Sequence, residues 1–359
     1  MSEFKINFQD TETAFADKSN PELKEKFWLF RLMNSPIMTE IGTKLTDVSL
    51  RLGLPVKGLI KRTVFRQFCG GETIEECQRT IEKLGASHIG TILDYSVEGK
   101  SAETVFESTK NEIIRTITRA KEDGNVPFAV FKVTGIARFE ILEKVNDGKE
   151  LLKGEAAEWD RSKARIDEIC TYAASINQPI FIDAEESWVQ NPVDSIAEEM
   201  MEKYNREQPI IYNTIQLYRR DRLEFLMESH RKAKENGYFL AVKLVRGAYM
   251  EKERERAEEM DYPSPIQPDK TATDRDYDAA IRYCLENVEE IAFVAGTHNE
   301  ESTCTLAELL HEKGIKHNHP HVFFSQLYGM SDNLSYVLAK HDYNVSKYCL
   351  LYTSPSPRD

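Results

Sequence analysis

The sequence predicts an α/β protein built on a (β/α)8 barrel of the TIM type. Eight short apolar runs, each rich in β-branched or aromatic residues, alternate with longer segments of helical periodicity. Each run begins apolar and ends polar. A chain of 359 residues has room for eight strand–helix pairs, and it lacks the glycine-rich first turn of a doubly wound sheet.

The eight runs are the predicted strands. They cover residues 88–95, 128–135, 180–186, 210–217, 240–247, 291–299, 322–329 and 343–350. Two of the segments between them show apolar stripes at helical spacing, namely Tyr277, Ile281, Cys284, Leu285 and Val288, and Leu334, Val337, Leu338 and His341.

Three segments lie outside this alternation. Residues 1–68 form a predicted N-terminal arm, helical from residue 21, and residues 69–348 form the barrel, with a helical insertion at 138–178. Residues 349–359 carry Pro355 and Pro357, which oppose a helix. We therefore expect them to be a non-native tail, so that the chain is C-terminally truncated and the barrel's final helix is missing.

Composition excludes several classes of protein. The chain has 47 Lys and Arg against 60 Asp and Glu, a net charge of -13 that disfavours nucleic acid as a partner. No apolar run approaches the ~20 residues of a membrane-spanning helix, and the N-terminus has no targeting pattern. We expect a cytoplasmic enzyme.

Polar groups stand at the end of every predicted strand. Because parallel barrel strands gather their carboxyl ends on one face, these groups are candidates for one large polar site. Each alone also fits a solvated strand end. They are Asp94, Lys132, Asp183 with Glu185, Gln216, Lys243 with Arg246, Thr297 with His298 and Asn299, Gln326, and Tyr348.

Lys132 and Asp183 each follow an apolar run and would be costly to bury unpaired. Their residue types fit either a structural ion pair between them or a shared ligand, and spacing does not separate the two. A metal site is disfavoured, since alternate histidines at 317, 319 and 321 on a short loop rarely converge on one ion. The chain also lacks a dinucleotide fingerprint and a P-loop.

The strand-end runs resemble those of the monofunctional proline dehydrogenases, flavoenzymes on a distorted (β/α)8 barrel. The resemblance covers about residues 65 to 348, in the family's order. Its motifs are 131–135 (FKVTG), 182–186 (IDAEE), 213–218 (NTIQLY), 243–249 (KLVRGAY), 296–299 (GTHN) and 325–330 (SQLYGM).

The resemblance implies FAD-dependent oxidation of L-proline to pyrroline-5-carboxylate, the first step of proline catabolism to glutamate, with electrons passed to a membrane quinone. It implies that Lys132 and Asp183 are catalytic, with Lys132 meeting the proline carboxylate and Asp183 holding that lysine. Lys132, Tyr249, Leu327 and Tyr348 are the implied substrate contacts. The implied FAD contacts are Gln216, Lys243, Arg246, Gly247, Lys270, Thr273, Asp274, Thr297, His298, Asn299 and Gln326.

Two other functions stay open. One is a different barrel enzyme, for example a metal-dependent hydrolase using His88, His298 and Asp183, although no H-x-H pair ends the first strand. The other is an inert or flavin-binding fragment, because the final helix of the family bears the arginines that clamp the substrate carboxylate.

A basic stretch at residues 51–66 carries five cations and no acid. Its apolar residues allow two arrangements, a helix docked on the barrel or a peripheral contact with the inner face of an anionic membrane near the quinone.

Overall fold

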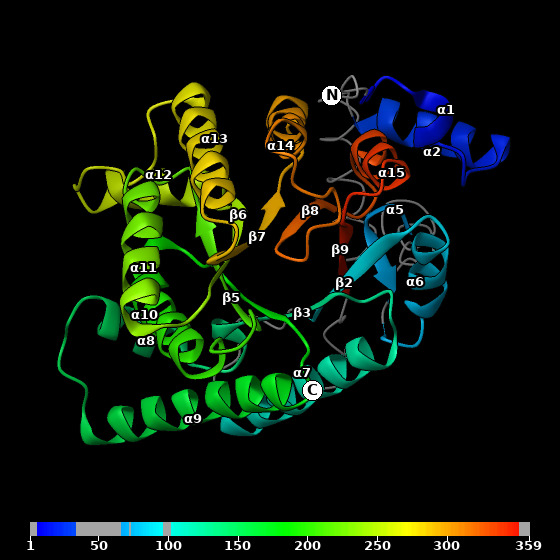
Figure 1. The fold of residues 1–359 in the computed structure, drawn as a ribbon. Helices are drawn as coiled ribbons and strands as arrows, with labels where there is room; N and C mark the ends of the chain where they lie inside the picture. Colours follow the sequence, from blue (N-terminus) through cyan, green and yellow to red (C-terminus); the bar gives the residue numbers. More distant parts are fainter. Residues whose placement is uncertain (1–5, 34–65, 72, 96–101, 352–359) are drawn as a thin grey trace.

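The structure is a computed structural model, and it describes residues 6–33, 66–71, 73–95 and 102–351. Its centre is a parallel sheet in the order β1-β9-β2-β3-β4-β5-β6-β7-β8, in which β9 also pairs with β8. Strands β2 to β9 therefore close into an eight-stranded barrel, which confirms the predicted fold class (Figure 1).

All eight predicted strands are present, each shorter than its apolar run. They are β2 (Ile89–Tyr95), β3 (Phe128–Lys132), β4 (Ile180–Asp183), β5 (Ile211–Gln216), β6 (Leu240–Val245), β7 (Ile291–Gly296), β8 (Val322–Leu327) and β9 (Val345–Leu351). Strand β1 (Cys69–Gly71) was not predicted, because its three residues include two glycines and form no apolar run.

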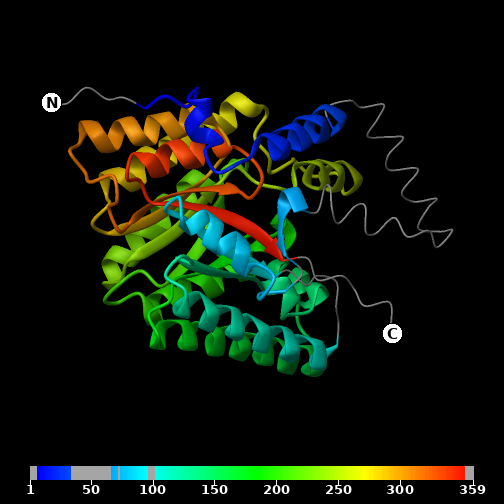
Figure 2. The same ribbon diagram turned by 90° about the vertical axis from the view of Figure 1, so that its right-hand side faces the viewer.

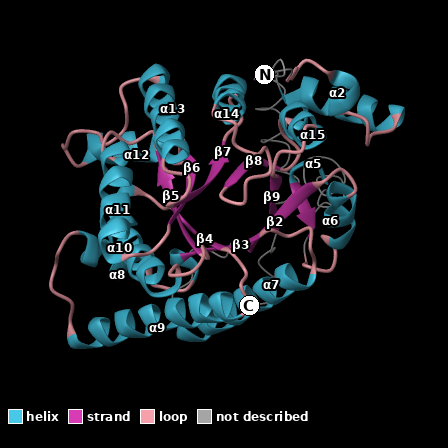
Figure 3. Ribbon diagram, in the orientation of Figure 1, coloured by secondary structure: helices cyan, strands magenta, loops and turns pink. Residues whose placement is uncertain are grey.

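Helices follow the strands in chain order and surround the barrel (Figure 3). They are α7 (Glu103–Glu122), α8 (Phe139–Asn146), α9 (Lys153–Ser175), α10 (Ser187–Tyr204), α11 (Arg222–Asn236), α12 (Met250–Glu259), α13 (Lys270–Glu286), α14 (Glu300–Glu312) and α15 (Asp332–Lys340). Helices α8 and α9 are the predicted insertion between the second and third predicted strands, preceded by a 3-10 turn, η2 (Val133–Gly135).

The described part of the N-terminal arm lies beside the last barrel elements. It comprises α1 (Thr11–Ala14), α2 (Asn20–Met33) and α5 (Arg66–Phe68), and the short helix α6 (Gln78–Gly85) follows within the predicted barrel segment. The hydroxyl of Tyr336 on α15 donates to Asp17 at 2.8 Å, which ties the arm to the barrel. From the side, β9 is the red strand, with α15 above it and α6 below it (Figure 2). Residues 34–65, which hold nearly all of the basic stretch, lie outside the described residues.

Strand β9 continues to Leu351, three residues beyond the predicted boundary at 348. Cys349 is buried and aligns with Leu93 of β2, so the first part of the predicted tail belongs to the sheet. Residues 352–359 are outside the described residues. None of the described helices is long and apolar enough to cross a membrane.

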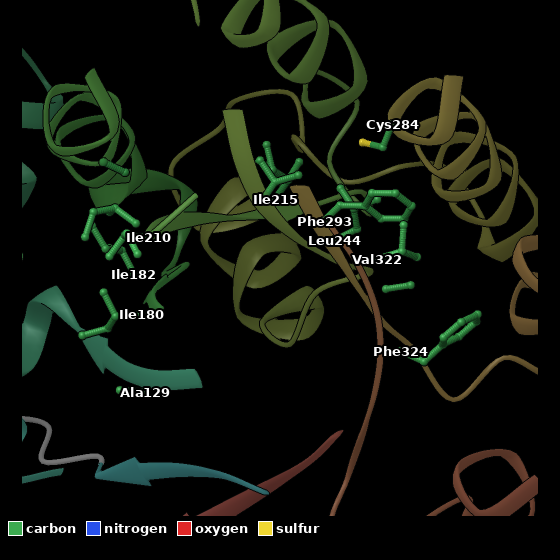
Figure 4. Packing of buried hydrophobic residues seen from close by; sticks show 14 of the residues in the cluster. Ala129, Ile180, Ile182, Ile210, Ile215, Leu244, Cys284, Phe293, Val322 and Phe324 are labelled. Carbon is green, nitrogen blue, oxygen red and sulfur yellow. The ribbon is translucent and has the colours of Figure 1, made fainter. Parts of the chain in front are cut away.

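Two apolar layers hold the barrel together. The outer faces of the strands pack against the helices through residues such as Ile182, Leu244 and Phe293, shown in Figure 4. The barrel interior is filled by a second cluster around Phe128 and Phe181, whose rings stack at 4.5 Å. The lumen is therefore a packed core, and a ligand is expected at the carboxyl ends of the strands.

Candidate active site

A cavity of about 620 Å³ lies at the carboxyl ends of the barrel strands. Every one of the eight barrel strands contributes at least one lining residue, so the cavity sits over the packed lumen. Each predicted site residue except Thr273 and Asp274 lines it. The strand ends singled out by their polarity are thus brought together in one place.

Thr273 and Asp274 lie on α13 behind the cavity wall. The Thr273 hydroxyl donates to the carbonyl of Asp269 at 3.2 Å, an ordinary contact within a helix. Asp274 accepts from Arg246 at 2.8 Å and from Lys270 at 2.5 Å. Burial acts to raise the pKa of Asp274, but these two cations hold it below its usual value. Asp274 therefore orients two residues that do line the cavity.

Asp183 is the centre of a buried group of charged and hydroxyl side chains in the cavity. Its Oδ1 forms an ion pair with Lys243 and accepts from the Thr214 hydroxyl at 3.3 Å, and its Oδ2 accepts from the Tyr348 hydroxyl at 2.5 Å. Asp183 and Lys243 are 8% and 6% exposed. The cation that pairs with Asp183 in the structure is Lys243, and the expectation that Asp183 also holds Lys132 stays a prediction.

Strand geometry places Lys132 and Lys243 differently relative to Asp183. Lys132 and Asp183 are register partners on β3 and β4, whereas Lys243 extends from β6 across the lumen between the rings of Phe181 and Tyr348, at 4.9 and 4.7 Å from their centroids. Burial, together with the charge of Asp183, raises the pKa of Tyr348, so its hydroxyl stays protonated and donates.

Lys132 lies toward a second wall of the cavity. Its Nζ donates to the Tyr249 hydroxyl at 3.4 Å, and that hydroxyl donates to Glu185 at 3.4 Å. Glu185 also accepts from the Thr134 hydroxyl at 2.7 Å, and its backbone carbonyl accepts from Gln216 at 2.7 Å. Burial is the main cause that raises the pKa of Tyr249.

On the opposite side, Arg246 is held by three neighbours. It donates to Asp274, to the Thr297 hydroxyl at 2.5 Å and to the Ser302 hydroxyl at 2.9 Å. Gln326 donates to the carbonyl of Thr297 at 3.2 Å. These bonds fix the direction of each side chain before any ligand enters.

His298 is held as a neutral ring. Burial, aided by the charge of Lys347, lowers its pKa to about 4. Its Nε2 accepts from the backbone N–H of Leu327 at 3.4 Å, so in the neutral tautomer Nδ1 carries the proton and donates to the Ser331 hydroxyl at 2.9 Å.

Gly247 is required by the close approach of its backbone to Tyr218. Its φ is +137°, and a Cβ there would lie 2.4 Å from the Tyr218 ring. A glycine in the KLVRGAY motif lets the chain turn from β6 into the loop that carries Tyr249.

Several lining residues were absent from the predicted site. Asp94 was noted at its strand end but given no role, and Thr214, Gly296 and Ser325 were not singled out. Thr214 stands two residues before Gln216 and Gly296 two before His298, so counting alternate positions back from each strand end would have found them.

The proposed metal set of His88, His298 and Asp183 is wrong. His88 precedes β2, at the amino end of the barrel, whereas His298 and Asp183 stand at the carboxyl ends of β7 and β4. The histidines at 317, 319 and 321 also precede their strand, and His317 and His321 bind the backbone carbonyls of His341 and Val288.

Comparison with known proteins gives consistent matches. The family model described as proline dehydrogenase matches residues 77–353. The carbapenem antibiotics biosynthesis protein CarD of Pectobacterium carotovorum subsp. carotovorum is 33% identical over 281 residues, covering 78% of this chain and 72% of the relative. Mitochondrial proline dehydrogenase 1 of Dictyostelium discoideum is 29% identical over 384 residues, covering 94% of this chain and 67% of the relative.

Among solved structures, proline utilization A (PutA) of Bdellovibrio bacteriovorus, inactivated by N-propargylglycine, superimposes with a TM-score of 0.69 at 18% identity. The alignment covers 96% of this chain and 35% of that chain, so this chain spans about a third of the PutA polypeptide. The likeness supports the barrel fold.

Proposed function

Because this chain belongs to the proline dehydrogenase family and is a flavin-dependent oxidoreductase, we propose that it oxidises L-proline to pyrroline-5-carboxylate with FAD as its cofactor. The observation that carries the proposal is the cavity at the strand ends, where partly exposed cations and buried amides surround the buried Asp183–Lys243 ion pair.

The side chains present suit an anionic, amide-rich cofactor. Lys243, Arg246 and Lys270 supply positive charge along one side of the cavity, while Gln216, Gln326 and Asn299 offer amide groups. These residues, together with Gly247, Thr297 and His298, are those we propose to hold FAD, with Thr273 and Asp274 supporting them from α13. FAD accepts the hydride when bound, and the protein supplies binding and orientation.

The substrate would lie on the side of the cavity formed by Lys132, Tyr249, Leu327 and Tyr348. We propose that Lys132 attracts the proline carboxylate and that Tyr249 keeps the lysine amine directed into the cavity. Asp183 holds Lys243 and the Tyr348 hydroxyl in fixed positions, so the groups facing the reacting carbon need no rearrangement.

The test is anaerobic reduction of the flavin by L-proline. The chain refolded with FAD should give an oxidised flavin spectrum that proline bleaches. Lys132→Met should leave that spectrum nearly unchanged and slow the bleaching severely, because Lys132 is on the proposed substrate side. A Lys132→Met variant that bleaches at the wild-type rate would remove Lys132 from the proposal.

We also propose a membrane quinone as the acceptor of electrons from the reduced flavin, at the cytoplasmic face of the membrane. The basic stretch at residues 51–66 is the proposed membrane contact. Changing Lys57, Lys61, Arg62 and Arg66 to Gln should weaken salt-sensitive binding to anionic vesicles. Binding that ignores both salt and these changes would leave the stretch with a packing role only.

A further inference from the structure

One buried carboxylate outside the cavity is linked to it by short hydrogen bonds. Asp194 lies on α10, is 4% exposed and does not line the cavity. Its Oδ1 accepts from Gln190 at 2.8 Å and from Asn213 at 2.9 Å, and its Oδ2 accepts from Arg222 at 2.6 Å. It therefore connects α10, β5 and α11.

The first link from Asp194 to the cavity runs through Gln190. The side-chain oxygen of Gln190 accepts from the backbone N–H of Glu185 at 2.7 Å. Glu185 stands two residues after Asp183, and both its carboxylate and its carbonyl bind cavity residues. Gln190 thus fixes the segment that follows β4, and Asp194 fixes Gln190.

The second link runs through β5. Asn213 donates to Asp194, and its own oxygen accepts from the backbone N–H of Thr214 at 2.8 Å. Thr214 faces the cavity and donates to Asp183 at 3.3 Å. Adjacent residues of one strand therefore connect Asp194 on the outside of the barrel to Asp183 on the inside.

The two links end two residues apart, the first on Glu185 and the second on Asp183, which pairs with Lys243. Asp194 can stay ionised in the protein interior and accept both bonds because Arg222, itself 6% exposed, balances its charge. A buried carboxylate with three charge-assisted or amide donors is rigid, since breaking any bond leaves a buried polar group unsatisfied.

We propose that Asp194 is a positioning residue for proline oxidation, acting through Gln190 and Asn213 to hold Asp183 and Glu185 at their places in the cavity. The inference rests on the proposed function. It adds Asp194, on a helix outside the cavity, to the residues that determine the rate of flavin reduction by proline.

The test compares Asp194→Asn with the wild type in anaerobic single-turnover mixing with L-proline. Asparagine turns an NH2 group toward Arg222, which removes the ion pair. It also gives Gln190 and Asn213 a neutral amide oxygen in place of a carboxylate oxygen, which weakens both links to the cavity. The fraction of flavin reduced reports how much protein is folded and loaded, whereas the rate constant of reduction at saturating proline reports the geometry of the site.

We expect the rate constant to fall at least tenfold in Asp194→Asn while the reducible fraction stays close to that of the wild type, because small misplacements of reacting groups cost one to two orders of magnitude in rate. A lower reducible fraction with an unchanged rate constant would overturn the proposal and leave Asp194 a purely structural role.

Arg165→Met is the matched control. Arg165 on α9 is 3% exposed and pairs with Glu103 and Glu107 of α7, away from the cavity lining. It should lose stability as Asp194→Asn does but keep the wild-type rate constant. A fall in its rate constant equal to that of Asp194→Asn would show that loss of any ion pair of a buried side chain has this effect, and would overturn the proposal.

Gln190→Met covers the case in which Asp194→Asn does not fold. It removes both the acceptor for the Glu185 N–H and the donor to Asp194, so it breaks the first link alone. It should also slow reduction, with faster backbone hydrogen exchange in residues 184–190 of the flavin-free protein. Unchanged exchange and rate would contradict the proposal. If L-proline does not reduce the flavin of the wild type, the proposed function has failed. If proline reduces the wild type and both variants at the same rate, only the positioning role of Asp194 has failed.

Discussion

Two buried lysines on barrel strands each form an ion pair with an aspartate, but only one of the two lines the cavity. Lys243 on β6 pairs with Asp183, and Lys347 on β9 pairs with Asp332 at 3.0 Å. They are 6% and 0% exposed. Lys243 lines the cavity, whereas Lys347 faces α15 and also donates to the carbonyl of Met330 at 2.5 Å.

The comparison teaches that burial and ion pairing alone do not identify a functional lysine. Lys347 extends from the outer face of its strand, and its partner Asp332 also binds Lys18 of the N-terminal arm at 3.0 Å. Burial acts to raise the pKa of Asp332, but the two lysines hold it below its usual value. The group of Lys18, Asp332 and Lys347 therefore joins the arm to the barrel, whereas the Asp183–Lys243 ion pair faces the cavity.

The largest expected difference between the two lysines is in turnover. Lys243→Met should slow flavin reduction by proline by about 10²–10³-fold, because it removes a positive charge that is fixed beside the proposed flavin site. Lys347→Met should keep the rate constant of the folded enzyme within about threefold. Single-turnover mixing measures both. Equal losses in the two variants would break the distinction.

The second difference is in stability. Lys347→Met leaves Asp332 with Lys18 as its remaining ion-pair partner and should lower the free energy of unfolding by about 3 kcal/mol. Denaturant titration followed by circular dichroism measures it, with Lys313→Met, an exposed residue that follows α14, as the control. A loss no larger than that of the control would mean that the arm is held by other contacts.

His298 lies between the two groups, since it lines the cavity and its pKa is lowered by burial and by the charge of Lys347. With a folded pKa of about 4 against an ordinary value of 6.5, its contribution to stability is present above pH 6.5 and is lost as the pH falls toward 4. The melting temperature should fall by a few degrees more in the wild type than in His298→Asn over this interval. Parallel curves would contradict the assignment.

The smallest expected effect is that of Thr214→Val. It removes the 3.3 Å bond to Asp183 while keeping the shape of the side chain, and it should cost about 1 kcal/mol of stability and less than fivefold in rate. Steady-state kinetics and thermal melts measure it. A larger loss of rate would mean that Asp183 depends on β5 more than on its ion pair with Lys243.

The eight strands and the polar strand ends could be predicted because each depends on local sequence. Side-chain contacts between strands that are not neighbours in the sheet could not be predicted. Asp183 was expected to hold Lys132, its neighbour in register, but a side chain from β6 reaches it across the lumen, and apolar runs do not encode such distances. The network of Asp194 was missed for a related reason, since its members are scattered along α10, β5 and α11 without a motif.

Strand β9 determines when the barrel can close. It pairs with β8, its neighbour in sequence, and with β2, where Val345 aligns with Ile89 across some 250 residues of intervening chain. Until β9 is synthesised, both β2 and β8 present an unpaired edge to other polypeptides. Contacts so distant in sequence form slowly, so the nascent protein should depend most on chaperones in the interval before residues 345–351 are added to the sheet.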